Sequence, residues 1–215
     1  MNAVRTFVFL DLEATGLPMD APKITEICLI AVHVSSLYET GKGQLPRIMD
    51  KLCLCVDPEK PLTEKASNMT GLSNENLTNN EKQEFNANLI QAIGGFLKRQ
   101  AKPICLVAHN GFSYHFALLK TEIYQLNVDF PDETLCLDSL HTFRKLDTST
   151  PKLGSALTEI YKGYFGKEPP NSHTAEGDAL ALISVFICEA RRILEVAKYK
   201  TWEEIRPMNT KRDIY

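Results

Sequence analysis

Two acidic residues at the end of the first apolar stretch have the type and spacing that metal chemistry needs. Residues 6–12 are rich in Phe and Val and predict a buried strand that carries Asp11 and leads to Glu13. Side chains two positions apart on a strand share one face, so burying both acids would be costly unless a cation such as Mg²⁺ neutralised them. The alternative is that the strand has already ended and both acids are solvated at the edge of a loop.

A second group of chemically capable residues precedes the last predicted helix. His173 lies five positions before Asp178, and Thr174 is a typical N-cap residue. Asp178 is therefore expected in the first turns of the helix and His173 in the loop before it. An acid there is also what the helix dipole favours, and a single loop histidine is commonly just solvated. Taken alone, each residue is compatible with a purely structural role.

The elements that must hold these residues change along the chain from strand-like to helix-like patterns. Three apolar or alternating segments come first, and helical stripes then alternate with short apolar runs. We therefore expect a mixed α/β sheet with helices packed on it, in a single domain over residues 1–206 with a polar tail over 207–215. Residues 35–46 are expected to form a hairpin loop. The predicted strands are 6–12, 24–34, 51–56, 103–108 and 134–137, and the predicted helices are 85–97, 116–126, 153–164 and 182–197.

Composition limits the partners and the compartment. The 215 residues carry 24 Lys and Arg against 27 Asp and Glu, so with a net charge of −3 any nucleic-acid binding must depend on a local site. No apolar run approaches the ~20 residues of a membrane span, and the N-terminus lacks a signal-peptide pattern. The six cysteines lie in apolar segments without a C-x-x-C pair, which favours free thiols over disulfides or a zinc site. These features predict a soluble intracellular protein of the nucleus or cytoplasm, without membrane association.

Five sequence blocks link the two acidic groups into one pattern. They are TFVFLDLEATGLP (6–18), TGLS (70–73), ICLVAHNGF (104–112), LCLD (135–138) and HTAEGD (173–178). In order and spread, the blocks resemble the DEDDh 3′–5′ exonucleases, the DnaQ-like group, and at finer grain the three-prime repair exonucleases of animals. The resemblance implies an α/β, RNase H-like fold with a mixed five-stranded sheet flanked by helices.

The resemblance also implies a reaction and its catalytic residues. Two Mg²⁺ or Mn²⁺ ions would be held by Asp11, Glu13 and Asp178, with Asp11 reaching both ions, and would activate water and clamp the scissile phosphate. His173 matches the general base of the family, a role that histidine can fill because it changes protonation near neutral pH. The implied activity is that of a 3′–5′ exodeoxyribonuclease that releases nucleoside 5′-monophosphates from DNA 3′ ends and prefers single-stranded DNA.

The substrate contacts carry over from the family in the same way. The backbone of Ala14 would meet the terminal nucleotide, Leu17 would separate the last two bases, and Tyr114 would contact the terminal phosphate or sugar. Without the resemblance, Leu17 would be an ordinary loop residue and Tyr114 a core aromatic. Family members are homodimers, and residues 51–56 have the alternation of an edge strand that could pair across a two-fold axis. The implied substrate-binding set is Glu13, Ala14, Leu17, His109, Asn110, Tyr114 and Asp178.

The chain departs from the family at residue 115. The segment FSYHF (112–116) places His115 where the family has an aspartate, the third of its four acids. Three outcomes are open: the second metal is lost and activity falls, His115 ligates a softer ion such as Mn²⁺ or Zn²⁺, or the chain holds DNA 3′ ends without cutting them. An engineered or variant change that disables the site is also open. The alternative function is therefore a catalytically impaired, exonuclease-like protein that binds DNA 3′ ends.

Two further features concern the substrate. Some relatives have an arginine-rich loop where residues 144–152 are short and modestly basic, which predicts weaker DNA binding with a shallower salt dependence. An oligoribonuclease-like action on RNA is a third hypothesis, although the block at residues 6–18 favours the DNA-directed relatives.

Overall fold

A mixed sheet forms the centre of the molecule in the computed structural model, which describes residues 3–128, 130, 134–148 and 154–208. The strand order is β3-β2-β1-β4-β5-β6. The first three strands are antiparallel, β4 and β5 run parallel to β1, and the last strand is antiparallel to β5. The strands are β1 (Thr6–Ala14), β2 (Ile24–His33), β3 (Asp50–Cys55), β4 (Ile104–Ala108), β5 (Leu135–Asp138) and β6 (Tyr199–Thr201). The predicted mixed α/β class is therefore confirmed.

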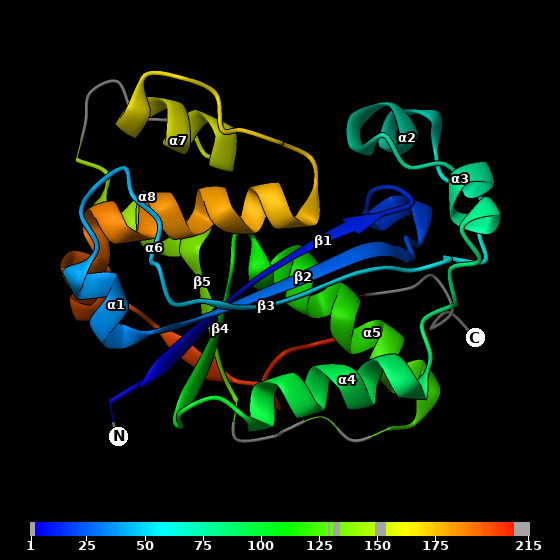
Figure 1. Ribbon diagram of the computed structural model, residues 1–215, viewed down its shortest axis with the longest axis horizontal. Coiled ribbons are helices and arrows are strands. Elements are labelled where there is room, and N and C mark those ends of the chain that lie inside the picture. Colours follow the sequence, from blue (N-terminus) through cyan, green and yellow to red (C-terminus); the bar gives the residue numbers. More distant parts are fainter. Residues whose placement is uncertain (1–2, 129, 131–133, 149–153, 209–215) are drawn as a thin grey trace.

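Helices cover both faces of the sheet (Figure 1). One face packs against α4 and α5, and the other against α1, α6, α7 and α8, which gives two separate apolar cores. The helices are α1 (Val34–Glu39), α2 (Glu64–Thr70), α3 (Asn74–Asn79), α4 (Ala87–Lys98), α5 (Phe116–Leu126), α6 (Ser139–Leu146), α7 (Leu157–Phe165) and α8 (Ala175–Val196).

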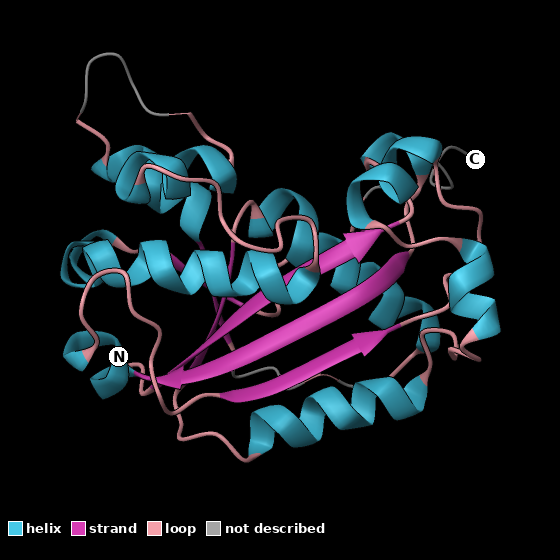
Figure 2. Cartoon of the chain, turned by 45° about the horizontal axis from the view of Figure 1, so that its top comes forward, coloured by secondary structure: helices cyan, strands magenta, loops and turns pink. Residues whose placement is uncertain are grey.

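Three predictions about the elements need correction. The sheet has a sixth strand, because the three-residue β6 is too short to show an alternating pattern yet pairs with β5. The expected hairpin loop at residues 35–46 is wrong at its start, since Val34–Glu39 form α1 and bury Leu37. Three helices, α2, α3 and α6, were not predicted. Neither α2 nor α3 has an apolar stripe, and only their N-caps Thr63 and Ser73 mark them. Helices α2 and α3 lie beyond the arrowhead of β1 (Figure 2).

The alternation of β1 decides where its acids point. Val8, Leu10 and Leu12 face α4 and α5, whereas Phe7 and Phe9 face α8 and pack on the Phe186 ring at centroid distances of 5.7 and 5.2 Å. The next residues of this second face are Asp11 and Glu13. The same periodicity that fills the core therefore turns both carboxylates toward the N-terminus of α8.

Further predictions concern the edge strand over residues 51–56, the polar tail over residues 207–215 and the modestly basic stretch over residues 144–152. Strand β3 lies at one edge of the sheet, as its alternation predicted. The N–H group of Met208 donates to the Ala117 carbonyl and the Thr121 hydroxyl of α5, at 3.2 and 2.8 Å. Residues 209–215 of the predicted tail and residues 149–152 of the modestly basic stretch lie outside the described residues. In the described part of the chain, no helix has the length and apolar character that crossing a membrane requires.

Candidate active site

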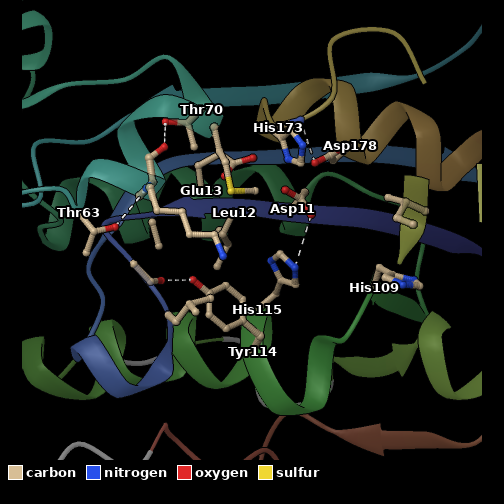
Figure 3. A pocket seen from close by; sticks show the side chains of 17 residues that line it. Asp11, Leu12, Glu13, Thr63, Thr70, His109, Tyr114, His115, His173 and Asp178 are labelled. Carbon is tan, nitrogen blue, oxygen red and sulfur yellow. Dashed lines mark hydrogen bonds and ion pairs between the residues drawn. The ribbon is translucent and has the colours of Figure 1, made fainter. Parts of the chain in front are cut away.

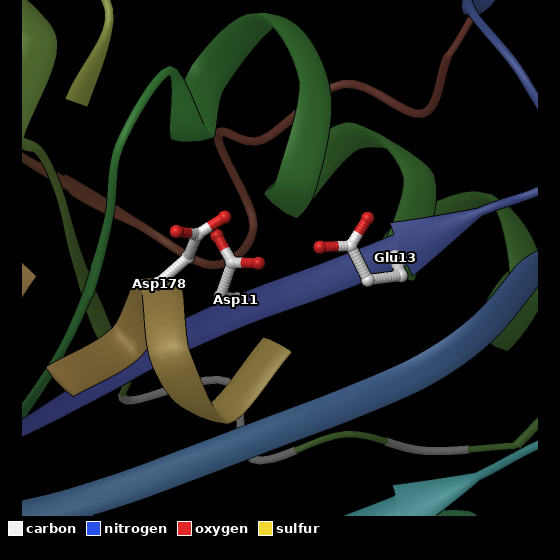
Figure 4. Close-up of side chains that lie close together, drawn as sticks. All are labelled: Asp11, Glu13 and Asp178. Carbon is white, nitrogen blue, oxygen red and sulfur yellow. The ribbon is translucent and has the colours of Figure 1, made fainter. Parts of the chain in front are cut away.

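Three carboxylates from two elements converge at the end of β1. Asp11 and Glu13 project from the strand, and Asp178 projects from the first turn of α8 (Figure 4). One oxygen of each lies within 4.8 Å of the others. The predicted grouping of these distant residues is therefore what the structure contains.

Local hydrogen bonds fix the start of α8 over the sheet. The Thr174 hydroxyl accepts a hydrogen bond from the Gly177 N–H at 3.0 Å, as predicted for an N-cap. The Ala175 N–H donates to the Glu26 carboxylate of β2 at 2.9 Å. A side chain at Gly177 would overlap the Asn171 carbonyl, so the close turn before the helix requires glycine there. Together these contacts place Asp178 directly above β1.

Burial and neighbouring negative charge raise the affinity of the three carboxylates for protons. Asp11 is only 6% exposed, and burial followed by the charges of Asp178 and Glu13 raises its pKa well above the usual range. Burial and the charges of Asp178 and Glu26 raise the pKa of Glu13 to about 8. Burial also raises the pKa of Asp178, against the lowering effect of a hydrogen bond from the His173 backbone. The cluster therefore favours bound positive charge, either as protons or as a cation.

An unpaired oxygen shows that the cluster suits a metal ion. Oδ2 of Asp178 accepts a hydrogen bond from the His173 N–H at 3.2 Å. Oδ1 of Asp178 is buried and has no hydrogen-bond partner among the described residues. Buried carboxylate oxygens are rarely left unpaired, and oxygen donors are what Mg²⁺ and Mn²⁺ bind. Asp11, Glu13 and Asp178 thus fit a divalent cation.

His173 lies beside this cluster in a strained backbone conformation. Its φ of 65° is in the left-handed region, which is uncommon for residues other than glycine. The side chain lines the same pocket as the carboxylates and lies next to Asp178 (Figure 3). Such strain persists where surrounding contacts impose it, here the hydrogen bond to Asp178 and the N-cap of α8.

His115 occupies the opposite side of the cluster. It ends a π-helical turn (Gly111–His115) between β4 and α5, and its side chain is 13% exposed. Its Nε2 lies 3.6 Å from Oδ1 of Asp11 (Figure 3). Burial, and secondarily the charge of His109, lowers the pKa of His115 to about 3, so the imidazole is neutral at physiological pH. Nδ1 of His115 is buried without a hydrogen-bond partner among the described residues.

A pocket of about 270 Å³ opens in front of the cluster. Six of the seven predicted substrate contacts line it, and the exception is Asn110, which precedes the π-helical turn with a left-handed φ of 58°. His109 is buried, and both ring nitrogens have protein partners, the Ser139 hydroxyl at 3.0 Å and the Ser155 carbonyl at 2.9 Å. The Tyr114 hydroxyl donates to the Gly16 carbonyl at 2.8 Å. Tyr114 thereby ties the π-helical turn to the loop that carries Leu17.

Sequence reasoning missed the opposite wall of the pocket. Helix α2 and its N-cap contribute this wall, and the Thr63 N–H donates to the Thr15 carbonyl at 2.9 Å, which attaches α2 to the end of β1. Met69 is 46% exposed and lines the pocket, as does Leu17, which is 47% exposed. The TGLS block flanking α2 was the available signal. The residues of this wall are Thr63, Lys65, Ala66, Met69 and Thr70.

A buried acid outside the cluster was also missed as a positioning residue. Asp138, at the end of β5, is 1% exposed. Its Oδ2 accepts a hydrogen bond from the Phe112 N–H at 3.0 Å, and its Oδ1 accepts one from the Leu140 N–H at 2.9 Å. The LCLD block therefore holds the π-helical turn that carries Tyr114 and His115.

Comparison with known proteins agrees with this architecture. Residues 8–186 match the family model described as exonuclease. The chain is 46% identical to three prime repair exonuclease 2 of Mus musculus, covering 94% of this chain and 92% of the relative. It is 41% identical to three-prime repair exonuclease 1 of Bos taurus, covering 95% and 70%. The solved structure of exonuclease I is similar at a TM-score of 0.66 and 16% identity, over 89% of this chain and 42% of that one.

The strand order, the helices on both faces and the similarity to exonuclease I define an RNase H-like fold. The sequence matches also identify the family, because they cover most of the chain at high identity. The chain belongs to the exonuclease family, with three prime repair exonucleases among its relatives. The predictions of an RNase H-like fold and of a 3′–5′ exonuclease are thereby confirmed.

Proposed function

We propose that this exonuclease is a metal-dependent 3′–5′ exodeoxyribonuclease that releases nucleoside 5′-monophosphates from DNA 3′ ends and prefers single strands. The observation that carries the proposal is the cluster of Asp11, Glu13 and Asp178, with oxygens within 4.8 Å and one of them buried without a partner. The relatives named three prime repair exonucleases support the polarity and the DNA substrate. The alternative of a silent end-binding protein depends on His115 alone, and the family match does not favour it.

The carboxylates would bind the catalytic cations. Asp11 lies between the other two acids (Figure 4) and faces His115, so it would serve two Mg²⁺ or Mn²⁺ ions, while Glu13 and Asp178 would hold the first. When bound, these ions would polarise the scissile phosphate and lower the pKa of the attacking water. They would also supply the positive charge that a chain with a net charge of −3 lacks.

His173 would move the proton. An imidazole accepts a proton from water near neutral pH, and the hydrogen bond from the His173 backbone to Asp178 holds this residue at the rim of the cluster. Because the contact is made by the backbone, the ring nitrogens remain outside that hydrogen bond. We therefore assign His173 the role of general base.

The pocket walls would hold an unpaired DNA end without reading its sequence. Leu17 and Met69 present half-exposed apolar side chains on which bases can stack. Ala14 offers its backbone at the end of β1, and Tyr114 positions the Leu17 loop through its hydrogen bond to Gly16. A solved structure of E. coli exonuclease I contains a dT13 oligonucleotide, which supports a single-stranded substrate for this fold.

The proposal is tested with three nucleic acids that carry a 5′ label: single-stranded DNA, blunt duplex DNA and single-stranded RNA. We expect a ladder that shortens from the 3′ end, release of nucleoside 5′-monophosphates, and faster digestion of single-stranded than of duplex DNA. A matched oligonucleotide with a blocked 3′ end controls for internal cutting. Cleavage of the blocked strand, or digestion that starts from the 5′ end, would overturn the assignment, and faster digestion of RNA would change the substrate class.

We also propose that the protein is a homodimer that pairs through strand β3. Its position at the edge of the sheet leaves one side of its backbone unpaired within the described chain. Light scattering at micromolar concentration should give twice the chain mass of 24.2 kDa. The Val56 N–H donates to the Thr25 carbonyl of β2, so the N–H of the preceding Cys55 points away from β2 toward the free edge. A Pro substitution for Cys55 should reduce that mass to the single chain, because it removes an N–H from this edge and none from the ladder with β2.

A further inference from the structure

The distance between His115 and Asp11 suits two ligands of one ion. Their Nε2 and Oδ1 atoms are 3.6 Å apart. Two donors that each lie about 2.1 Å from one ion are about 3.0 Å apart at right angles and about 4.2 Å apart when opposite. The observed distance falls between these limits, so the separation of the two atoms suits binding of the same ion.

We propose that His115 is a nitrogen ligand of a metal ion shared with Asp11, and that it shifts the site from Mg²⁺ toward Mn²⁺, Co²⁺ or Zn²⁺. This inference rests on the proposed function, because it concerns the second of the two catalytic cations. Mg²⁺ prefers oxygen donors, whereas these transition metals accept imidazole readily. The substitution thus changes which ion the enzyme uses.

The surroundings of His115 leave it available for this role. Among the described residues that line the pocket, the acids are Asp11, Glu13 and Asp178, so the second ion has no further carboxylate there. No hydrogen bond to either ring nitrogen of His115 holds the ring in another role within the described chain, since Nδ1 is unpaired and Nε2 faces Asp11. The π-helical turn directs the ring into the pocket, where Figure 3 shows it beside Asp11.

Metal binding without DNA tests the inference. Calorimetric titration of the wild type and of His115→Asp with MgCl₂ and with MnCl₂ gives the ratio of the two affinities for each protein. We expect the preference for Mn²⁺ over Mg²⁺ to fall at least tenfold in His115→Asp, with Mg²⁺ affinity increasing. An unchanged ratio would overturn the proposal.

A spectroscopic signature separates ligation from an indirect effect. Mn²⁺ bound to the wild type should show electron spin-echo modulation from a directly bound ¹⁴N nucleus. The signal should survive in His173→Ala and vanish in His115→Asp. A signal that persists in His115→Asp, or one absent from the wild type, contradicts the proposal. If the signal is present but single-stranded DNA is not digested, the metal assignment stands and the proposed function fails.

A second, independent observation concerns two cysteines on neighbouring strands. Cys28 of β2 and Cys53 of β3 are register partners, and their sulfur atoms are 2.7 Å apart. Opposite residues of an antiparallel pair have Cα atoms about 4.5–5.5 Å apart, within the range that a disulfide spans. On its other side Cys28 is the register partner of Asp11, so the three residues lie in one row across the sheet.

We propose that Cys28 and Cys53 form an intramolecular disulfide by exchange with a small disulfide such as oxidised glutathione. The exposed Cys53 thiolate attacks one glutathione sulfur, forms a mixed disulfide and releases one glutathione thiol. Cys28 then loses its proton, attacks the Cys53 sulfur and expels the second glutathione thiol. Two protein thiols and one small disulfide thus give one protein disulfide and two small thiols. The hydrogen bond shared with Cys28 lowers the pKa of Cys53, and Cys53 is the exposed member of the pair, which favours it as the attacking group.

Cys55 offers a matched control on the same strand. It is also exposed, but its register partner in β2 is Glu26 rather than a cysteine. After incubation with oxidised glutathione, non-reducing peptide mapping should find Cys28 linked to Cys53 in the wild type and in Cys55→Ser. The melting temperature should rise by roughly 5–10 °C in the oxidised forms and return after reduction. Stable glutathione adducts on Cys53, a different cysteine pair, or an unchanged melting temperature with both thiols free would overturn the proposal.

Discussion

At the scale of single residues, the central feature is a set of acids that repel one another. No lysine or arginine of the described chain forms an ion pair with Asp11, Glu13 or Asp178. The charge of Asp178 raises the pKa of both other acids. A structural acid in a fold is normally paired or exposed. These three lie together at the floor of a pocket, which is the arrangement that cation binding requires.

The protonation of Glu13 predicts how stability depends on pH. Its pKa is raised from 4.5 to about 8 in the fold, so the native state keeps a proton that the unfolded state has released. The contribution to the free energy of unfolding is complete below about pH 4.5 and is lost as the pH rises through 8. We expect the metal-free protein to melt at progressively lower temperature over this window. The pKa of Asp11 is also raised, so its ionisation lowers the stability in the same direction as the pH rises.

Glu13→Gln provides the control for this effect, because it removes the titrating group while keeping the shape of the side chain. The melting temperature of this variant should depend less on pH over the same window. Saturating Mn²⁺ should likewise flatten the wild-type profile. A wild-type stability that rises between these pH values would contradict the account of the cluster.

The motif order and the family resemblance predicted which acids the structure brings together, but not the whole pocket. Asp11, Glu13, His173 and Asp178 belong to motifs in which order along the chain carries the information. Met69 and Lys65 lie on a short helix whose apolar residue faces a pocket rather than the core, so no periodic pattern marks them. The two hydrogen-bond partners of His109 could not be predicted from sequence either, because both lie at least thirty positions away along the chain.

At the scale of elements, short connections hold the pocket together. The loop after β1 carries Leu17 and is joined to α5 through Lys23, whose ammonium contacts Glu122 at 2.8 Å and Gln125 at 2.9 Å. Glu122 is 3% exposed, so this ion pair is buried on its acidic side. The backbone N–H of Lys23 also donates to the Thr15 hydroxyl at 3.0 Å.

Removing this cation should cost stability. In Lys23→Met, Glu122 keeps a buried charge without its partner, and we expect a loss of roughly 1–3 kcal/mol in the free energy of unfolding. The KM for single-stranded DNA should rise because the Leu17 loop is less well held. In the double variant Lys23→Met/Glu122→Leu, part of the stability should return. Chemical denaturation measures both, and a single variant as stable as the wild type would show that the pair has no such role.

Elements that bury a regular apolar pattern were predictable, whereas several short helices and β6 were not, for a physical reason. Helices α4, α5 and α8 and strands β1 and β2 bury regular stripes of apolar side chains, so the spacing of apolar residues in the sequence predicts them. Helix α1 buries only Leu37, and α2 buries none of its residues fully. Strand β6 depends on pairing with β5 and on the buried Trp202 that follows it, which are tertiary features.

At the scale of the whole molecule, the two faces of the sheet differ in the residues that they carry. The face against α4 and α5 is an apolar core, and the face against α8 passes along β1 from apolar core to the carboxylate cluster. The molecule as a whole is acidic, and among the described residues that line the pocket Lys65 is the single lysine or arginine. Binding energy must therefore come mainly from metal ions and stacking.

This charge distribution predicts a weak salt dependence of DNA binding. With one or two phosphate contacts to basic side chains, the slope of log K against log salt for single-stranded DNA should be about −1. Fluorescence anisotropy with Ca²⁺ in place of the catalytic ion, between 50 and 200 mM salt, measures it. A slope steeper than about −3 would mean that a basic surface outside the pocket also binds the DNA phosphates. Lys65→Gln should bring the slope closer to zero.

Whether the carboxylate cluster drives catalysis is tested most directly by comparing 3′-terminal nucleotide release by the wild type and by Asp178→Asn. The amide keeps the shape and the acceptor for the His173 N–H, but it removes one of the three charges that would hold the cation. In the presence of Mn²⁺ we expect the rate to fall at least about 100-fold, while the metal-free variant melts no lower than the wild type. Chelation of the metal should abolish release by the wild type. Comparable rates for the two proteins, or release that persists with chelator, would contradict the assignment of the carboxylate cluster as the metal-dependent catalytic centre.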